Sequence, residues 1–302
     1  MALAPVVFFR NPALAGAAPT WRRLPSPTGA RMPLNLLNMP LNFLKMHANG
    51  DDFVLIDARG RDNPISAERA RALGDRRRGI GFNQLVVLGD CQESAAQLTF
   101  FNADGSSLAT CGSATRGAAD LLLNESGATS VQVKTARGLQ HCLRLEDQSV
   151  SVEMGLPSFD WQAIPLAREL DSLHLPLPGT PAACSMGNPH CSFFVEDLQP
   201  LDLATLGPRI ESDPLFPHKT NVHFIQVIDR QTIRLRIWER NGAIPLGSGS
   251  CSCAAAVNGI RRGLLDSPVR VLCDGGPVTV SWDGQGKVRL AGSVTRVFSG
   301  SL

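Results

Sequence analysis

The segment FNADGSSLATCGS (residues 101–113) returns in altered form 137 residues later as WERNGAIPLGSGS (residues 238–250). In both segments a polar residue precedes a small nucleophilic residue by nine positions, Asn102 before Cys111 and Glu239 before Ser248. A glycine follows each nucleophilic residue and opens a run that suits a helix. An internal repeat of this length predicts two similar domains. The two copies differ in chemistry, because a thiol titrates much nearer neutral pH than a serine hydroxyl does.

The stretches around both segments predict the same order of elements, a sheet wrapped around a helix in each half. In the first half, apolar patterns predict strands at 53–57, 85–88, 97–101, 131–135 and 149–153, and helices at 66–73 and 112–123. In the second half, they predict strands at 221–229, 232–238, 269–273, 278–282 and 287–290, and a helix at 249–260. We therefore expect an N-terminal domain over residues 39–160 and a C-terminal domain over residues 161–298, with end strands able to exchange between them.

Residues 1–38 differ in composition from the rest of the chain. They contain no Asp or Glu, but they include Arg10, Arg22, Arg23 and Arg31. We expect a disordered N-terminal extension. An organelle transit segment is the alternative, because such segments are rich in arginine and poor in acids.

Composition excludes several classes of function. The 302 residues are 43% hydrophobic with a formal net charge of +2, and no long basic run indicates nucleic-acid binding. No apolar stretch reaches the roughly 20 residues of a membrane span. We expect a cytoplasmic enzyme acting on a small molecule.

The eight cysteines indicate free thiols, not disulfides or a metal site. The chain is long and lacks a secretory signal, and Cys251 and Cys253 are spaced too closely for a usual zinc pair. We interpret these two as small residues that pack a helix. The sequence also lacks a glycine-rich phosphate loop, so we expect no pyridoxal phosphate, metal or nucleotide.

The repeated glycines have a chemical consequence. A helix N-terminus offers free backbone N–H groups and about half a positive charge, and two such ends at one point form an anion site. We therefore expect a carboxylate between the helices that follow Cys111 and Ser248, with the pKa of the Cys111 thiol depressed by its position. The alternative is that Cys111 is a buried residue at a helix start and nothing more.

At these residues the chain resembles the diaminopimelate epimerase family over about residues 43–298. The motifs that carry the resemblance are KMHANGDDF (45–53), GIGFNQ (79–84), the segment from Asn102 to Gly112, GNPH (187–190), TNV (220–222) and Glu239-Arg240. The resemblance implies an α/β (α+β) fold of two pseudo-symmetric domains, each a mostly antiparallel sheet around a central helix. It also implies a cofactor-independent isomerase of amino acids, with diaminopimelate in lysine biosynthesis as the expected substrate, and a homodimer.

The resemblance also implies roles for individual residues. Cys111 and the residue at 248 transfer protons on opposite faces of the α-carbon, with His190 and Glu239 as their proton-tuning neighbours. Gly112, Ser113, Gly249 and Ser250 hold the reacting carboxylate, and Gln84 and Asp51 meet the reacting amino group. Asn102, Asn188, Asn221, Glu239 and Arg240 bind the far end of the substrate. Taken without the resemblance, Asn188 and Asn221 fit turn residues, His190 fits a core histidine, and Glu239 and Arg240 fit a solvated pair.

The chain departs from the family pattern at the reacting end. Ser248 replaces the second catalytic cysteine, and the family usually has Asn at 51, Asp at 83 and Asn at 113, where this chain has Asp51, Asn83 and Ser113. These changes leave four functions open. The protein is an epimerase of diaminopimelate, a racemase of another amino acid such as histidine, a lyase, dehydratase or isomerase that uses Cys111 alone, or a non-catalytic amino-acid-binding paralogue.

Overall fold

The computed structural model describes residues 41–302, so the expected extension at 1–38 lies outside the described residues. The described helices are α1 Ala67–Gly74, α2 Gly112–Ser126, α3 Leu203–Glu211 and α4 Gly249–Arg261. The strands of the first half are β1 Asn42–Ala48, β2 Asp51–Asp57, β3 Gln84–Gly89, β4 Ala96–Asn102, β5 Ser107–Leu108, β6 Ser130–Thr135, β7 Gly138–Arg144 and β8 Val150–Gly155. Those of the second half are β9 Ala182–Ser185, β10 Pro189–Val195, β11 Asn221–Asp229, β12 Thr232–Trp238, β13 Val269–Cys273, β14 Gly276–Ser281, β15 Val288–Gly292 and β16 Thr295–Ser301.

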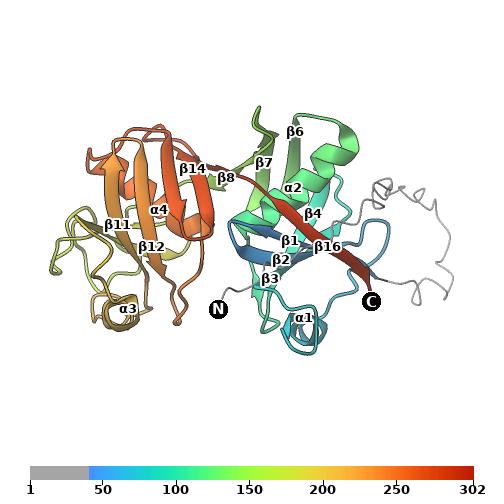
Figure 1. The fold of residues 1–302 in the computed structure, drawn as a ribbon, viewed down its shortest axis with the longest axis horizontal. Helices are drawn as coiled ribbons and strands as arrows, with labels where there is room; N and C mark the ends of the chain where they lie inside the picture. Colours follow the sequence, from blue (N-terminus) through green and yellow to red (C-terminus); the bar gives the residue numbers. More distant parts are fainter. Residues whose placement is uncertain (1–40) are drawn as a thin grey trace, which may run out of the picture.

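The described strands form one continuous sheet that curls into two lobes (Figure 1). The order is β16-β1-β2-β3-β4-β6-β7-β8-β15-β14-β13-β12-β11-β10-β9, with β5 paired to β4. Most neighbouring strands are antiparallel, and β8 joins the lobes by pairing with β15. This arrangement confirms the expected α+β fold of two similar halves.

The repeat extends to the register of individual residues. Phe53 pairs with Gln84 in the parallel ladder between β2 and β3, and His190 pairs with Asn221 in the parallel ladder between β10 and β11. Both partners of the second pair lie 137 residues after those of the first. The two lobes are therefore the same structure built twice, as the sequence repeat predicts.

Helices α2 and α4 lie within the two curled halves of the sheet. Every residue from Cys251 to Gly259 is buried, which is the pattern of a helix covered on all sides. Such a helix needs small side chains, because strands surround it. Both helices contain several Ala and Ser residues, and α4 adds Cys251 and Cys253. The eight cysteines are free among the described residues, which confirms the prediction of unpaired thiols.

The last strand crosses back to the first lobe. β16 pairs antiparallel with β1, and the rings of Phe298 and Phe43 meet edge to face with centroids 6.0 Å apart. Figure 1 shows this strand running from the second lobe across the first. The predicted domain bounds at residues 160 and 161 stay a prediction. Among the described helices, none is long and apolar enough to span a membrane.

Candidate active site

The helices α2 and α4 begin at one shared cleft between the lobes. A Cβ built on Gly112 would lie 3.6 Å from Leu290 Cδ2, and one built on Gly249 would lie 2.9 Å from the same atom. Met154 lies against both positions as well, at 3.0 and 3.8 Å. A Cβ at either glycine would press against the ends of these two side chains. Glycine at both positions therefore leaves room for Leu290 and Met154 between the two helix starts. The cleft has a volume of about 1320 Å³.

Neither helix start is capped by a side chain. Cys111 and Ser248 occupy the N-cap positions with nearly identical extended backbones, at φ −142° and φ −146°, and neither makes a side-chain capping hydrogen bond. Serine is a strongly preferred capping residue, so the uncapped start of α4 departs from the usual pattern. The free N–H groups of both helices remain at the cleft, where they favour a bound anion.

The structure brings most of the predicted site residues together. The cleft is lined by Asp51, Gln84, Asn102, Cys111, Gly112, Ser113, Asn188, Glu239, Arg240, Ser248, Gly249 and Ser250. His190 and Asn221 are buried and do not line it. Asn221 instead holds the backbone beside the cleft, because its Oδ1 accepts a hydrogen bond from the Arg240 N–H at 2.9 Å.

The Cys111 thiol corrects one expectation from the sequence. Its Sγ lies 3.8 Å from Gln84 Oε1, and the N–H groups of Ser113 and Ala114 are directed at it. Burial has the larger effect and, helped by the charge of Asp51, raises the pKa of Cys111 to about 12. The expected depression of this pKa at a helix start is therefore wrong for the ligand-free protein, because desolvation outweighs the helix N–H groups.

Asp51 and Asn83, the two positions at which we expect the family's usual residues to be exchanged, form one hydrogen-bonded pair. Asn83 Nδ2 donates to Asp51 Oδ1 at 2.9 Å, and Ser113 also hydrogen-bonds this carboxyl group. The exchange keeps an amide beside a carboxyl group but moves the carboxyl to position 51. Burial raises the pKa of Asp51, and its charge acts on both Cys111 and Glu239. The charge of Asp51 therefore raises the pKa of both Cys111 and Glu239.

On the opposite side of the cleft, the Glu239 carboxyl group and the Ser248 hydroxyl are neighbours. Burial raises the pKa of Glu239, which favours its protonated form, and the charge of Asp51 adds to this effect. Ser248 also reaches the thiol of Cys251. The serine hydroxyl does not titrate near neutral pH itself. Two groups that can hold a proton, the Glu239 carboxyl group and the Cys251 thiol, lie next to it.

Arg116 of α2 supplies a buried positive charge that sequence reasoning missed. Its side chain is 1% exposed, and its Nη2 donates to Asn49 Oδ1 at 3.3 Å. Nε and Nη1 have no hydrogen-bond partner within residues 41–302. Burial lowers the pKa of Arg116 to about 10, while Asp51 and Cys111 act in the opposite direction. A buried cation with unpartnered N–H groups favours anions in the cleft beside it.

Thiol labelling should report the raised pKa of Cys111 directly. Only the thiolate reacts, so iodoacetamide should label Cys111 slowly at about pH 7 and about tenfold faster per pH unit up to about pH 10. Asp51→Asn should speed the labelling at every pH, because it removes a negative charge that opposes the thiolate. Mass spectrometry of the peptide that contains Cys111 measures both rates.

The labelling experiment needs a background without Cys91. That residue is partly exposed, and a hydrogen bond with Ser94 lowers its pKa, so it would react first. Cys91→Ser removes this reaction away from the cleft. A labelling rate at Cys111 that stays constant between about pH 7 and pH 10 would contradict the raised pKa.

A family model of known proteins matches this chain in two segments, one in each half. A family model described as diaminopimelate epimerase matches residues 43–159 and 182–297. A diaminopimelate epimerase from Rhizorhabdus wittichii is 45% identical over 266 residues, which cover 86% of this chain and 95% of the relative. One from Chromobacterium violaceum is 37% identical and covers 87% of this chain and 99% of the relative.

Solved structures share the fold at low sequence identity. A phenazine biosynthesis protein of the PhzF family from Bacillus anthracis has a TM-score of 0.65 at 16% identity, covering 87% of this chain and 99% of that one. A hydroxyproline epimerase from Agrobacterium vitis has a TM-score of 0.59 at 16% identity, covering 88% and 93%. With its family model matched in both halves and its relatives matched nearly end to end, the chain belongs to the diaminopimelate epimerase family.

Proposed function

We propose that the protein is a cofactor-independent amino-acid epimerase that inverts the α-carbon of diaminopimelate. The observation that supports this most directly is the pair of uncapped helix starts at one cleft, with Cys111 at one and the Glu239–Ser248 pair at the other. Such a site places an anion-binding position between two groups that handle protons. The substrate is inferred from the names of relatives that are 37–45% identical over most of the chain.

In this proposal, substrate binding activates Cys111. The α-carboxylate binds the free N–H groups at the starts of α2 and α4, and the α-ammonium group binds Asp51 and Gln84. Pairing with the ammonium group neutralises Asp51, whose charge otherwise raises the pKa of Cys111. The Cys111 thiol gives its proton to water as this pKa falls, and the thiolate then takes the α-proton. The electrons of the broken C–H bond remain on the α-carbon and its carboxylate. The helix N–H groups stabilise that charge as it develops.

The opposite face returns a proton. The Ser248 hydroxyl gives its proton to the α-carbon while the protonated Glu239 carboxyl group gives its own to the serine oxygen. One proton has then moved from Glu239 to the carbon, and the original α-proton stays on Cys111. Because the two groups lie on opposite sides of the cleft, the configuration is inverted. The raised pKa of Glu239 supports this step, since more of the carboxyl group is protonated than usual.

The remainder of the cleft suits a second amino-acid group. Asn102, Asn188 and Arg240 also line the cleft, and Asn102 Nδ2 donates a hydrogen bond to Ser106 Oγ at 3.0 Å. Amide and guanidinium groups bind a carboxylate with directed hydrogen bonds. Diaminopimelate has such a group at its far end, which supports the substrate and a place in lysine biosynthesis.

Incubation in deuterated water tests the proposal. The substrates are diaminopimelate and a panel of L-amino acids that includes histidine, and the readouts are mass spectrometry and chiral chromatography. Deuterium at the α-carbon of diaminopimelate together with inverted product is the expected result. Exchange and inversion of another amino acid alone would reassign the substrate. Binding without any exchange would overturn the epimerase and favour a non-catalytic binding protein.

A one-base reaction is the second candidate, and Ser248 is the observation that favours it. In this reaction Cys111 removes a proton, and the Ser248 hydroxyl, which does not titrate near neutral pH, returns none. Deuterium incorporation without inversion, loss of ammonia or water, or movement of a double bond would identify this outcome in the same experiment.

We also propose a cytoplasmic location, which the eight unpaired cysteines support because reducing compartments keep thiols free. The possible homodimer stays a prediction, and light scattering of the purified protein would test it.

A further inference from the structure

A buried chain of hydrogen bonds leads from the C-terminal end of α4 toward the cleft. It starts at Arg261, whose Nη1 donates to Asn258 Oδ1 at 3.2 Å. Asn258 Nδ2 donates to Ser192 Oγ at 3.0 Å, and Ser192 Oγ lies 3.1 Å from His223 Nδ1. Asn258, Ser192 and His223 are all 0% exposed, so water cannot substitute for any of these partners.

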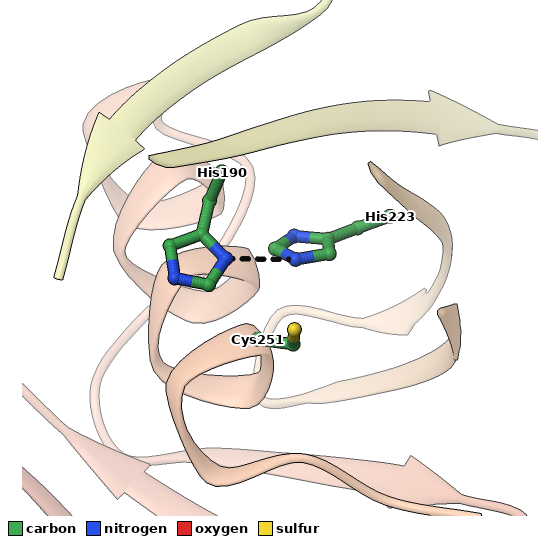
Figure 2. Close-up of side chains that lie close together, drawn as sticks. All are labelled: His190, His223 and Cys251. Atoms are coloured by element: carbon green, nitrogen blue, oxygen red, sulfur yellow. Dashed lines mark hydrogen bonds between the residues drawn. The ribbon is translucent and has the colours of Figure 1, made fainter. Parts of the chain in front are cut away.

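The line continues from His223 to the cleft. His223 Nε2 lies 3.1 Å from His190 Nδ1, and His190 Nε2 lies 2.9 Å from Asn188 Oδ1. Figure 2 shows the two imidazoles facing each other through these nitrogens. Asn188 Nδ2 then donates to Ser250 Oγ at 3.4 Å, which is the longest link. Asn188 and Ser250 both line the cleft.

The direction of every bond follows from the first one. Arginine can only donate, so Asn258 presents its oxygen to Arg261 and its NH₂ group to Ser192. The Ser192 hydroxyl has then accepted one bond, and its own proton is left for His223 Nδ1. His223 is consequently protonated on Nε2 and donates to His190 Nδ1. His190 is protonated on Nε2 in turn and donates to Asn188.

If the hydrogen bonds beyond Ser192 ran in the opposite direction, one buried donor would have no acceptor. If His223 carried its proton on Nδ1, Ser192 would accept bonds from both His223 and Asn258. Its own hydroxyl proton would then have no acceptor among these partners in a fully buried position. An unsatisfied buried donor is costly, so one direction is strongly favoured. Burial also lowers the pKa of both histidines, so both are neutral and each carries a single ring proton.

We propose that this chain of hydrogen bonds determines the direction in which the Ser250 hydroxyl donates its proton. In this proposal His223 and Ser192 are positioning residues for binding the substrate carboxylate. Because Asn188 donates to Ser250, the serine oxygen is occupied as an acceptor and its proton is directed to another group. The choices are the sulfur of Cys251, a weak acceptor, and a carboxylate in the cleft. The chain thus prepares a hydrogen-bond donor at the start of α4. This role rests on the proposed function for the identity of the ligand, but the direction of the chain does not.

The same residues also form a compact group of metal-binding types. Ligand atoms of His190, His223 and Cys251 lie within 4.8 Å of one another, all buried (Figure 2). However, all four ring nitrogens are already engaged in the chain, and the thiol is strongly held in its protonated form because burial raises its pKa. A metal would have to displace two protons from a sealed site, so the hydrogen-bonded chain is the better account of this cluster.

Histidine tautomers provide the first test, and they require no substrate. Two-dimensional nitrogen–proton NMR of the ligand-free protein, labelled with ¹⁵N-histidine, distinguishes protonation at Nε2 from protonation at Nδ1. His190→Asn and His223→Asn assign the two signals. Both rings should carry the proton on Nε2 alone. A proton on Nδ1 of either ring would overturn the proposed direction, and stoichiometric Zn²⁺ uptake that shifts both signals would replace the chain with a metal site.

A pair of serine variants provides the second test. Ser192→Ala removes the hydroxyl that sets the direction, and it should raise the dissociation constant of diaminopimelate about tenfold or more, as expected for a hydrogen bond to a charged group. Ser172→Ala is the matched control, because Ser172 accepts a bond from the same Arg261 at 3.2 Å but lies off the chain. Its dissociation constant should stay near that of the parent protein.

The outcomes separate this inference from the proposed function. Melting temperatures of both variants show whether loss of binding reflects loss of structure. Equal weakening in Ser192→Ala and Ser172→Ala, or an unchanged dissociation constant in Ser192→Ala, would overturn the positioning role. If the parent protein does not bind diaminopimelate while both histidines carry Nε2 protons, the proposed substrate fails and the directed chain stands.

Discussion

Cys111→Ala should reduce exchange of the substrate α-proton with deuterated water by about a thousandfold or more, because a positioned proton-transfer group contributes roughly 10²–10⁴-fold. Cys111 is the thiol at the start of α2, where it lines the cleft beside Gln84. Mass spectrometry of diaminopimelate after timed incubation measures the exchange. Cys91→Ala is the control, because it removes a thiol that does not line the cleft. Its exchange rate should match that of the parent protein.

If Cys111→Ala still exchanges the α-proton, Asp51 becomes the candidate for the base. That residue has a pKa raised by burial and acts electrostatically on both sides of the cleft, so it is the remaining titrating group at the reacting end. Asp51→Asn would then abolish exchange. If Cys111 is the base, Asp51→Asn should mainly raise the KM, since the variant loses the charge that meets the substrate ammonium group.

Ser248→Cys should increase inversion relative to exchange by about tenfold or more, because a thiol is a far better proton donor to carbon than a serine hydroxyl. The new thiol would stand at the start of α4 next to Glu239 and facing the cleft. The ratio of inverted product to α-deuterated starting isomer, measured by chiral chromatography, gives the effect without reference to the amount of active protein.

Ser252→Cys is the matched control for this variant. Ser252 lies in the first turns of the same helix, but it is buried and hydrogen-bonds the Ser248 carbonyl without lining the cleft. A thiol there should leave the ratio unchanged. If Ser248→Cys also leaves it unchanged, Ser248 does not face the reacting carbon and the two-sided mechanism is wrong for this protein.

Much of the fold could be predicted because the sequence carries it twice. Strong apolar patterns located β12 and β13 to the residue, and Ser66 and Gly127 marked helix ends that the structure has. Helix α3 was missed because Gly207 and Pro208 are poor helix formers. The repeat could have revealed it, since α3 follows α1 at almost the common offset and Asp202 caps its start.

The site was predictable in membership but not in electrostatics. Most of the residues that the resemblance identified line the cleft, although His190 and Asn221 do not. The pKa of Cys111 depends on how completely protein surrounds the thiol and on the charge of Asp51. Neither can be read from spacing along the chain. His223, Ser192 and Asn258 were missed for a similar reason, because only the packing of α4 against β10 and β11 brings them into one line.

The crossing of β16 to the first lobe has a consequence for how the molecule is made. A ribosome makes residues 42–48 long before residues 295–301, so the outer edge of β1 has no partner while all the strands between them are made. An unpaired strand edge can pair with strands of other chains, so the nascent first lobe is prone to aggregation until β16 is made. The same crossing connects the two lobes. A chain that ends before β16 therefore loses the strand that pairs with β1, in the lobe that was synthesised first.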